Sequence, residues 1–375
     1  MSSFVISCGG TGGHLAPGIS LAQSLLERKH KCWLLISNKT IDARLIKKYP
    51  EIKFVCVPGV ALSFKPLRFL KFCYYLLSGF VFNLKFLSSH KPSLVIGFGG
   101  FISAGVGLAS LVLGYPLVLH EANHQPGRAI RLLAPFAQRV YLPSGVKIKN
   151  LAVSLMRHYG YPVRSEIRCI PKKTARQNLG IDRDGKLLVI IGGSQGARSL
   201  NDWVLKHFER LGAKGISIYC ISGLSKVSQG TLEVNSVDGR NAKVYWVPFS
   251  DRMSSVYSSA DLVVSRAGAG SIAEIVRCQV PSILIPYPYA ADNHQLANAR
   301  FMEQHGAALV LEQKRLDHLS EEVIELIFNE WLLENFRQNL QKLDRKDCLE
   351  RITLDLEHLA AHSQRYTRPK SGALS

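Results

Sequence analysis

The sequence is poor in acidic residues. Only 28 aspartates and glutamates stand against 47 lysines and arginines, so the formal net charge of the 375 residues is +19. This balance favours a polyanionic partner such as nucleic acid, an anionic membrane surface or a phosphorylated substrate. We expect no nucleic acid among the partners, because the basic residues are dispersed and no RNA- or DNA-binding motif occurs.

Paired cysteines are also missing. The eight cysteines occur singly, without a C-x-x-C sequence. This argues against a zinc site and a disulfide framework and is typical of a reducing cytoplasm. One uncharged run, residues 92–119, is long enough to span a bilayer. Glycine and proline turns divide it into strand, helix and strand, so we expect a buried β-α-β unit instead.

Two common nucleotide-binding motifs are absent. No G-x-x-x-x-G-K-[ST] sequence occurs, which argues against a P-loop NTPase. A nicotinamide site needs G-x-G-x-x-G and an acidic residue roughly 20 positions later. Gly10 and Gly12 fit the first two glycines, but Leu15 replaces the third, and no carboxylate ends the second expected strand. A dehydrogenase is therefore also a poor fit.

Short apolar runs alternate with helical stretches along the whole chain, beginning with a strand and a helix over 17–28. This β-α-β rhythm predicts doubly wound parallel sheets. The rhythm restarts after an irregular region near residues 160–170, so the fold class is α/β, with two Rossmann-like domains over 1–163 and 164–335. We expect the two domains to face each other across a cleft, and residues 363–375 to form a disordered tail.

Each half places a glycine turn after its first strand: CGGTGGH over 8–14 and GGSQGAR over 192–198. Glycine backbones and helix N-termini bind diphosphates, although such glycines can also serve tight strand-to-helix packing alone. His14 ends the first turn and opens a helix. The helix dipole disfavours its protonation, which suits a general base; a capping or packing histidine is the alternative.

A third constellation lies in DLVVSRAGAGSIAEI, residues 261–275. Arg266 ends a strand where a leaving diphosphate would need a cation, and Glu274 could accept hydrogen bonds from two ribose hydroxyls or cap the helix. Polar side chains gather shortly afterwards in PYPYAADNHQLANA and suit sugar hydroxyls. The alternative there is a helix N-cap formed by Asp292.

Seven motifs together resemble the MurG family of bacterial peptidoglycan glycosyltransferases: GGTGGHLAPG, GFGGFISAG, HEAN, YPVR, GGSQGAR, SRAGAGSIAE and DNHQLANA. The resemblance covers residues 4–310. It implies a two-domain glycosyltransferase-B fold and an inverting transfer of N-acetylglucosamine (GlcNAc) from UDP-GlcNAc to lipid I, which gives lipid II. It also implies no cofactor, no essential metal, and a C-terminal helix over about 336–362 that packs back on the N-terminal domain.

The resemblance assigns residues to both substrates. Phe249 matches the residue that covers the uracil, Arg266 the arginine beside the phosphates, and Glu274 the ribose ligand. The remaining donor residues border the diphosphate or recognise GlcNAc: Ser194, Gln195, His294, Gln295 and Asn298. The acceptor residues of the first half are His14 as the base, with Thr11, Gly12, Gly13, Asn123 and Arg164. Three positions depart from the family: His294 and Ala122 replace frequent glutamines, and Tyr161 replaces a frequent asparagine.

The implied chemistry is a single displacement, which needs a base for the acceptor hydroxyl and charge stabilisation for departing UDP. His14 and Arg266 fill these roles, with Glu121 as the reserve base. Alternatives are a diacylglycerol glycosyltransferase of the same fold, a UDP-sugar epimerase and a nucleotide-sugar sensor. The sensor would keep Arg266 and Glu274 but would not need His14.

Basic residues flank an apolar segment over 64–91 whose uncharged core is too short to span a bilayer. Such a segment suits the membrane interface, although a core helix with solvated basic ends is the alternative. We expect a peripheral protein on the cytoplasmic face of the bacterial inner membrane. Its partners would be the anionic lipid surface and other proteins of cell-wall synthesis.

Overall fold

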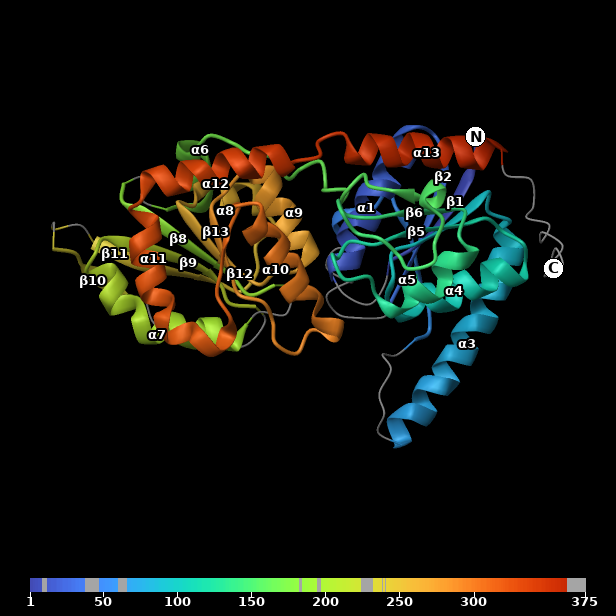
Figure 1. Cartoon of the computed structure of the whole chain (residues 1–375), viewed down its shortest axis with the longest axis horizontal. Coiled ribbons are helices and arrows are strands. Elements are labelled where there is room, and N and C mark those ends of the chain that lie inside the picture. The colour runs from blue at the N-terminus through green and yellow to red at the C-terminus, as the bar shows by residue number, and fades with distance from the viewer. Residues whose placement is uncertain are drawn as a thin grey trace. The chain divides into compact units, whose positions relative to one another are not determined.

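The computed structural model describes residues 1–8, 12–37, 47–59, 66–181, 184–193, 197–223, 232–237, 239 and 241–362. The chain divides into two compact units (Figure 1). Unit 1 comprises Met1–Arg164 and Arg345–Ser375, and unit 2 comprises Ser165–Asp344. The expected disordered tail, residues 363–375, lies outside the described residues.

Unit 1 is built on seven described strands, all paired in parallel, in the order β3-β2-β1-β4-β5-β6-β7. The strands are β1 (Ser3–Ser7), β2 (Lys31–Ile36), β3 (Lys53–Cys56), β4 (Leu94–Gly97), β5 (Leu117–His120), β6 (Arg139–Tyr141) and β7 (Met156–Arg157). The helices are α1 (Gly12–Glu27), α3 (Pro66–His90), α4 (Gly100–Val112), α5 (Arg128–Leu133) and α13 (Cys348–His362), with short 3₁₀ turns η1 (Ala134–Phe136) and η2 (Val153–Leu155).

Alternating strand residues of unit 1 face two helical layers, as in a doubly wound sheet. Phe4 and Ile6 pack with α1 and α13, whereas Val5 belongs to the cluster that includes α3, α4 and α5. Because both faces are covered, the central strands read as continuous apolar runs. The uncharged segment 92–119 forms β4, α4 and β5, as predicted. Among the described residues, no helix has both the length and the apolarity needed to cross a membrane.

The C-terminal region corrects one expectation. Instead of one helix over 336–362, the chain forms α12 (Glu330–Leu343), which belongs to unit 2, and α13, which belongs to unit 1. Polar contacts fasten α13 to unit 1: Tyr141 Oη donates to Asp355 Oδ2 at 2.9 Å, and Arg28 Nη1 lies 3.1 Å from Glu357 Oε2. The break at 344–347 is thus where the chain leaves one unit for the other.

Unit 2 has a second sheet in the order β10-β11-β9-β8-β12-β13-β14, parallel except for the β10–β11 pair. The strands are β8 (Lys186–Ile191), β9 (Ile216–Ile221), β10 (Glu233–Asn235), β11 (Asn241–Val247), β12 (Leu262–Ser265), β13 (Ser282–Leu284) and β14 (Leu309–Val310). The helices, besides α12, are α6 (Lys172–Leu179), α7 (Arg198–Gly212), α8 (Met253–Ser259), α9 (Ala269–Cys278), α10 (His294–Gln304) and α11 (Leu319–Ile327), with 3₁₀ turns η3 (Ala291–Asn293) and η4 (Gln313–His318).

Among the described parallel strands of each sheet, the strand order reverses at one point. It lies between β1 and β4 in unit 1 and between β8 and β12 in unit 2. At such a switch point the chain leaves neighbouring strands in opposite directions, and ligands of open α/β sheets bind in the crevice at their carboxyl ends. Both glycine turns of the sequence follow a strand at a switch point, β1 and β8.

Candidate functional site

The switch point of unit 2 carries the residues expected to bind the donor. β8 ends at Ile191, β12 ends at Ser265, and the two strands pair with each other. Arg266 follows β12 directly. Ser194 and Gln195 belong to the glycine turn after β8, but both lie outside the described residues.

Arg266 is buried, with 7% of its surface exposed. Its Nη1 donates to the carbonyl of Ile285 at 3.2 Å, and its Nη2 donates to Ser199 Oγ at 3.0 Å and to Gln313 Oε1 at 2.6 Å. The guanidinium carbon lies 5.5 Å from the centre of the Tyr287 ring, within the range of a cation–π contact. The segment after β13, helix α7 and the turn η4 therefore hold the side chain in one position.

All of these partners of Arg266 are neutral. Within the part of the chain that the structure describes, no carboxylate forms an ion pair with it. Burial lowers the pKa of the guanidinium because desolvation disfavours the charged form, yet arginine remains protonated at physiological pH. A buried cation without a counter-ion is suited to an anionic ligand, and the diphosphate of a nucleotide sugar is such a ligand.

Glu274 lies in the second turn of α9 and accepts a hydrogen bond from Tyr257 Oη at 3.1 Å. Its position in the helix rules out the capping alternative, since an N-cap precedes the first turn. Tyr257 comes from α8, and the turn that leads from β11 into α8 carries the exposed Phe249. The α8 segment thus links the regions of Phe249 and Glu274.

Two of the residues expected to recognise the sugar form hydrogen bonds with the backbone near Arg266. Asn298, with 1% of its surface exposed, donates from Nδ2 to the carbonyl of Ala267 at 3.1 Å. Gln295 accepts from the backbone N–H of Tyr287 at 2.9 Å through Oε1. The structure therefore gathers these residues of α10 around the strand end that carries Arg266.

The start of α10 has an unusual backbone. Asp292 and Asn293 have φ values of 51° and 54°, a left-handed conformation that is uncommon outside glycine. Asn293 is the residue before the helix, without a side-chain capping bond, so the expected alternative of an Asp292 cap is wrong. His294 Nδ1 lies 2.7 Å from the carbonyl of Ala291, which assigns the proton to Nδ1 and leaves Nε2 for other partners.

The switch point of unit 1 carries the proposed base. α1 begins at Gly12 rather than at residue 17, so His14 lies in its first turn, half-buried. Gly99 follows β4 with φ 85°, and a Cβ built there would lie 4.0 Å from His14 Cε1. His14 therefore lies between the ends of two neighbouring strands. Thr11 lies outside the described residues.

A proline inside α1 explains a contact near His14. Pro17 has no N–H, so it cannot donate to the carbonyl of Gly13 four residues earlier. Tyr161 Oη donates to that carbonyl instead, at 3.2 Å. The tyrosine that departs from the family pattern thus completes the first turn of the helix that carries His14.

His120 is a buried residue that the sequence analysis overlooked. Its Nε2 donates to the carbonyl of Gly160 at 3.0 Å, and its ring packs 4.8 Å from that of Phe98. Burial, with a smaller contribution from the charge of His14, lowers the pKa of His120 to about 4. His120 is therefore a neutral neighbour of His14 at physiological pH. The sequence feature that could have identified His120 is its position at the end of the apolar strand β5.

Glu121 holds the loop that carries Asn123. Oε1 accepts from the backbone N–H and the Nδ2 of Asn123, at 2.8 and 3.0 Å, and Oε2 accepts from the N–H of Gly127 at 2.7 Å. Burial raises the pKa of this carboxyl, and the same hydrogen bonds oppose the increase. These hydrogen bonds indicate a structural role for Glu121 instead of the expected role of a reserve base.

Arg164 ends the first segment of unit 1 and is half-buried. Its Nη1 donates to Tyr49 Oη at 3.4 Å. Tyr49 belongs to the core that packs against α1 and α13, so Arg164 lies on the same side of the sheet as the helix of His14.

Comparison with known proteins identifies the family. Residues 4–142 match the N-terminal domain of glycosyltransferase family 28, and residues 187–352 match its C-terminal domain. A UDP-N-acetylglucosamine–N-acetylmuramyl-(pentapeptide) pyrophosphoryl-undecaprenol N-acetylglucosamine transferase of Opitutus terrae is 48% identical over 359 residues, 96% of this chain and 95% of the relative. A relative of the same name from Caldanaerobacter subterraneus is 33% identical, over 93% of this chain and 97% of its own.

Solved structures confirm the glycosyltransferase-B fold. MurG of Acinetobacter baumannii superposes with a TM-score of 0.72 at 21% identity, over 95% of this chain and 99% of that one. The glycosyltransferase of kitacinnamycin superposes with a TM-score of 0.69 at 15% identity, over 96% and 99% of the two chains. The chain therefore belongs to glycosyltransferase family 28 and, within it, to the MurG family.

Proposed function

We propose that this glycosyltransferase transfers GlcNAc from UDP-GlcNAc to lipid I, undecaprenyl-diphospho-N-acetylmuramoyl-pentapeptide, and so makes lipid II for peptidoglycan. The 48% identity to the Opitutus terrae transferase over nearly the whole chain carries this proposal. The structure adds a buried, uncompensated cation at one switch point and a histidine at the other.

The reaction needs two charge movements at once. As the acceptor hydroxyl attacks the anomeric carbon, its proton must leave, and the glycosyl–phosphate bond breaks with its electrons passing to UDP. His14 takes the proton. Arg266 stabilises the negative charge that develops on the diphosphate, and its neutral partners hold it in place before the reaction, so little reorganisation is required.

We assign the remaining donor contacts from the motifs shared with the MurG family. Phe249 covers the uracil, and Glu274 accepts from the ribose hydroxyls. Gln295 uses Oε1 for the Tyr287 backbone, which leaves its amide N–H groups for GlcNAc, together with Nε2 of His294. Asn298, whose Nδ2 donates to the carbonyl of Ala267, contributes to the same GlcNAc site.

Glu274→Ala is expected to raise the KM for UDP-GlcNAc about tenfold to a hundredfold, because a hydrogen bond to a charged group contributes roughly 1.5–3 kcal/mol. The contact exists in the ground state and the transition state alike, so kcat should change little. Steady-state kinetics at saturating acceptor measures both constants. Tyr257→Phe is the matched control, since it removes the bond to Glu274 but keeps the carboxylate. An unchanged KM in Glu274→Ala would exclude the ribose contact.

Helix α3 suits attachment to the membrane surface. Figure 1 shows it projecting beyond the rest of unit 1. Tyr74, Leu77 and Val81 recur on one face of the helix, with 69%, 64% and 42% of their surfaces exposed. Apolar side chains that are exposed on one face of a helix can insert into the membrane interface. Lys85 is exposed on the same face, where its charge would attract anionic lipid headgroups.

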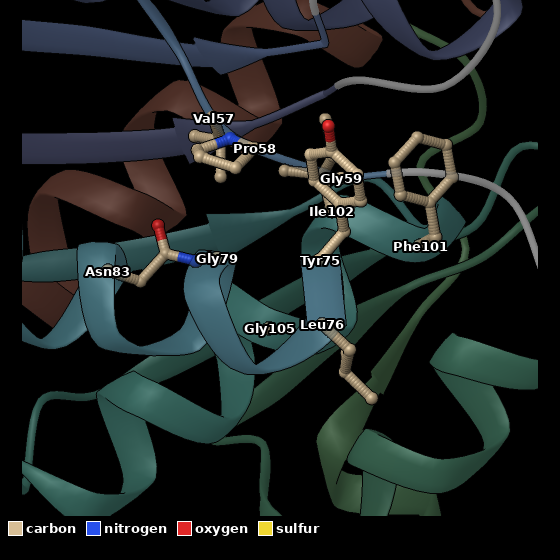
Figure 2. A pocket seen from close by; sticks show the side chains of 10 residues that line it. All are labelled: Val57, Pro58, Gly59, Tyr75, Leu76, Gly79, Asn83, Phe101, Ile102 and Gly105. Carbon is tan, nitrogen blue, oxygen red and sulfur yellow. The ribbon is translucent and has the colours of Figure 1, made fainter. Parts of the chain in front are cut away.

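The opposite face of α3 is fixed to unit 1. It borders a small, mostly apolar pocket with the loop after β3 and with α4 (Figure 2). A Cβ added to Gly79 would lie 2.6 Å from the carbonyl oxygen of Pro58, so glycine permits this close approach. Because one face is anchored and the other exposed, we assign α3 the role of membrane anchor on the cytoplasmic face of the inner membrane.

The double variant Tyr74→Ser, Leu77→Ser should bind anionic phospholipid vesicles more weakly and keep full activity on a soluble acceptor. Each lysine or arginine near an anionic surface adds about 1 kcal/mol, so binding by the parent chain should also fall with salt. Vesicle sedimentation measures both. Leu354→Ser is the control, because Leu354 is an exposed apolar residue on α13, across the sheet from α3. Equal losses in the two proteins would contradict an anchor at α3.

A further inference from the structure

Gln313 makes the shortest contact to Arg266. It stands at the start of η4, shortly after the last strand of unit 2, and its Oε1 accepts from Nη2 at 2.6 Å. Acidic residues are the usual partners of a buried arginine, because they offset the cost of burying its charge. Here an amide occupies the place that a carboxylate of the same shape could fill.

The acidic residue nearest to Gln313 in the sequence forms an ion pair with a different side chain. Glu312 pairs with Lys314 at 2.9 Å, and this contact lowers the pKa of its carboxyl. The other two hydrogen-bond acceptors of Arg266 are the backbone carbonyl of Ile285 and the hydroxyl of Ser199. The charge of Arg266 is thus fixed in position by three neutral acceptors.

We propose that Gln313 is a positioning residue that orients Arg266 while leaving its positive charge uncompensated for the anionic leaving group. A glutamate at this position would hold the guanidinium equally well but would neutralise it. Glutamine at position 313 therefore favours the binding of an anion, whereas glutamate would favour the stability of the protein without bound ligand. This inference rests on the donor site proposed above, in which Arg266 faces the diphosphate.

Gln313→Glu tests the proposal, because the two side chains have the same shape. The KM for UDP-GlcNAc and the inhibition constant of UDP should both rise about tenfold or more, as for loss of a charged hydrogen bond, while the melting temperature stays equal or rises. Gln313→Met removes the hydrogen bond but adds no charge, so its loss should be smaller. Gln341→Glu adds the same charge at an exposed position on α12 and should leave both constants unchanged.

Three results would overturn the proposal. If Gln313→Met loses as much UDP affinity as Gln313→Glu, UDP binding depends on the hydrogen bond from Arg266 and not on the neutral charge of the Gln313 side chain. If Gln313→Glu binds UDP like the parent chain while Arg266→Met does not, Gln313 has no such role and the donor site stands. If Arg266→Met also binds UDP normally, the donor site itself is wrong, and this inference falls with it.

Discussion

His14→Ala is expected to lower kcat about a hundredfold to ten-thousandfold, the usual contribution of a general base. The KM for UDP-GlcNAc should change little, because the imidazole acts on the acceptor. The surroundings of His14 support this role: His120 is neutral beside it, and Tyr161 completes the first turn of its helix. Initial rates with a soluble acceptor analogue measure the effect.

His358→Ala is the control for this prediction, since His358 is an exposed histidine on α13 of the same unit. A folded His14→Ala variant that keeps most of its turnover would contradict the assignment. Glu121 would not replace His14 readily, because its two carboxylate oxygens already accept three hydrogen bonds from its own loop.

Arg266→Met is expected to lower kcat about a hundredfold to a thousandfold, in line with the loss of one group that stabilises developing negative charge. Unlike the effect of Glu274→Ala, this loss should appear in kcat as well as in KM, because the charge on UDP grows towards the transition state. Single-turnover rates at saturating donor separate the chemical step from binding.

Arg266→Lys is the informative comparison for the charge. It keeps the cation but cannot reproduce the planar contacts to Ser199 and Gln313, so it should recover only part of the lost rate. Single-turnover rates of Arg266→Met equal to those of the parent chain would exclude charge stabilisation by this residue.

The sequence predicted the two switch points well for a simple physical reason. Central parallel strands are buried on both faces and read as short apolar runs, and glycine turns mark their carboxyl ends. Arg266 follows such a strand directly, and His14 lies just after the glycine turn that follows another, so their placement required only local patterns. The β-α-β interpretation of residues 92–119 was confirmed on the same grounds.

Contacts between distant segments could not be predicted in this way. Gln313 reaches Arg266 from 47 residues away, and Gly160 accepts from His120 across 40 residues. Neither pair carries a local pattern. Pro17 suggested a helix start, because proline favours the first turn; the tyrosine that compensates for it lies 148 residues beyond Gly13. The break between α12 and α13 also depends on which unit each helix packs against.

The most direct test of the account is transfer itself. The protein is incubated with labelled UDP-GlcNAc and either a soluble lipid I analogue or diacylglycerol, with and without EDTA, and the products are identified by mass spectrometry and NMR. The account predicts release of UDP and a GlcNAc–MurNAc disaccharide with inverted, β configuration at the new bond. Transfer to diacylglycerol alone, retention of configuration, or loss of all activity in EDTA would contradict it.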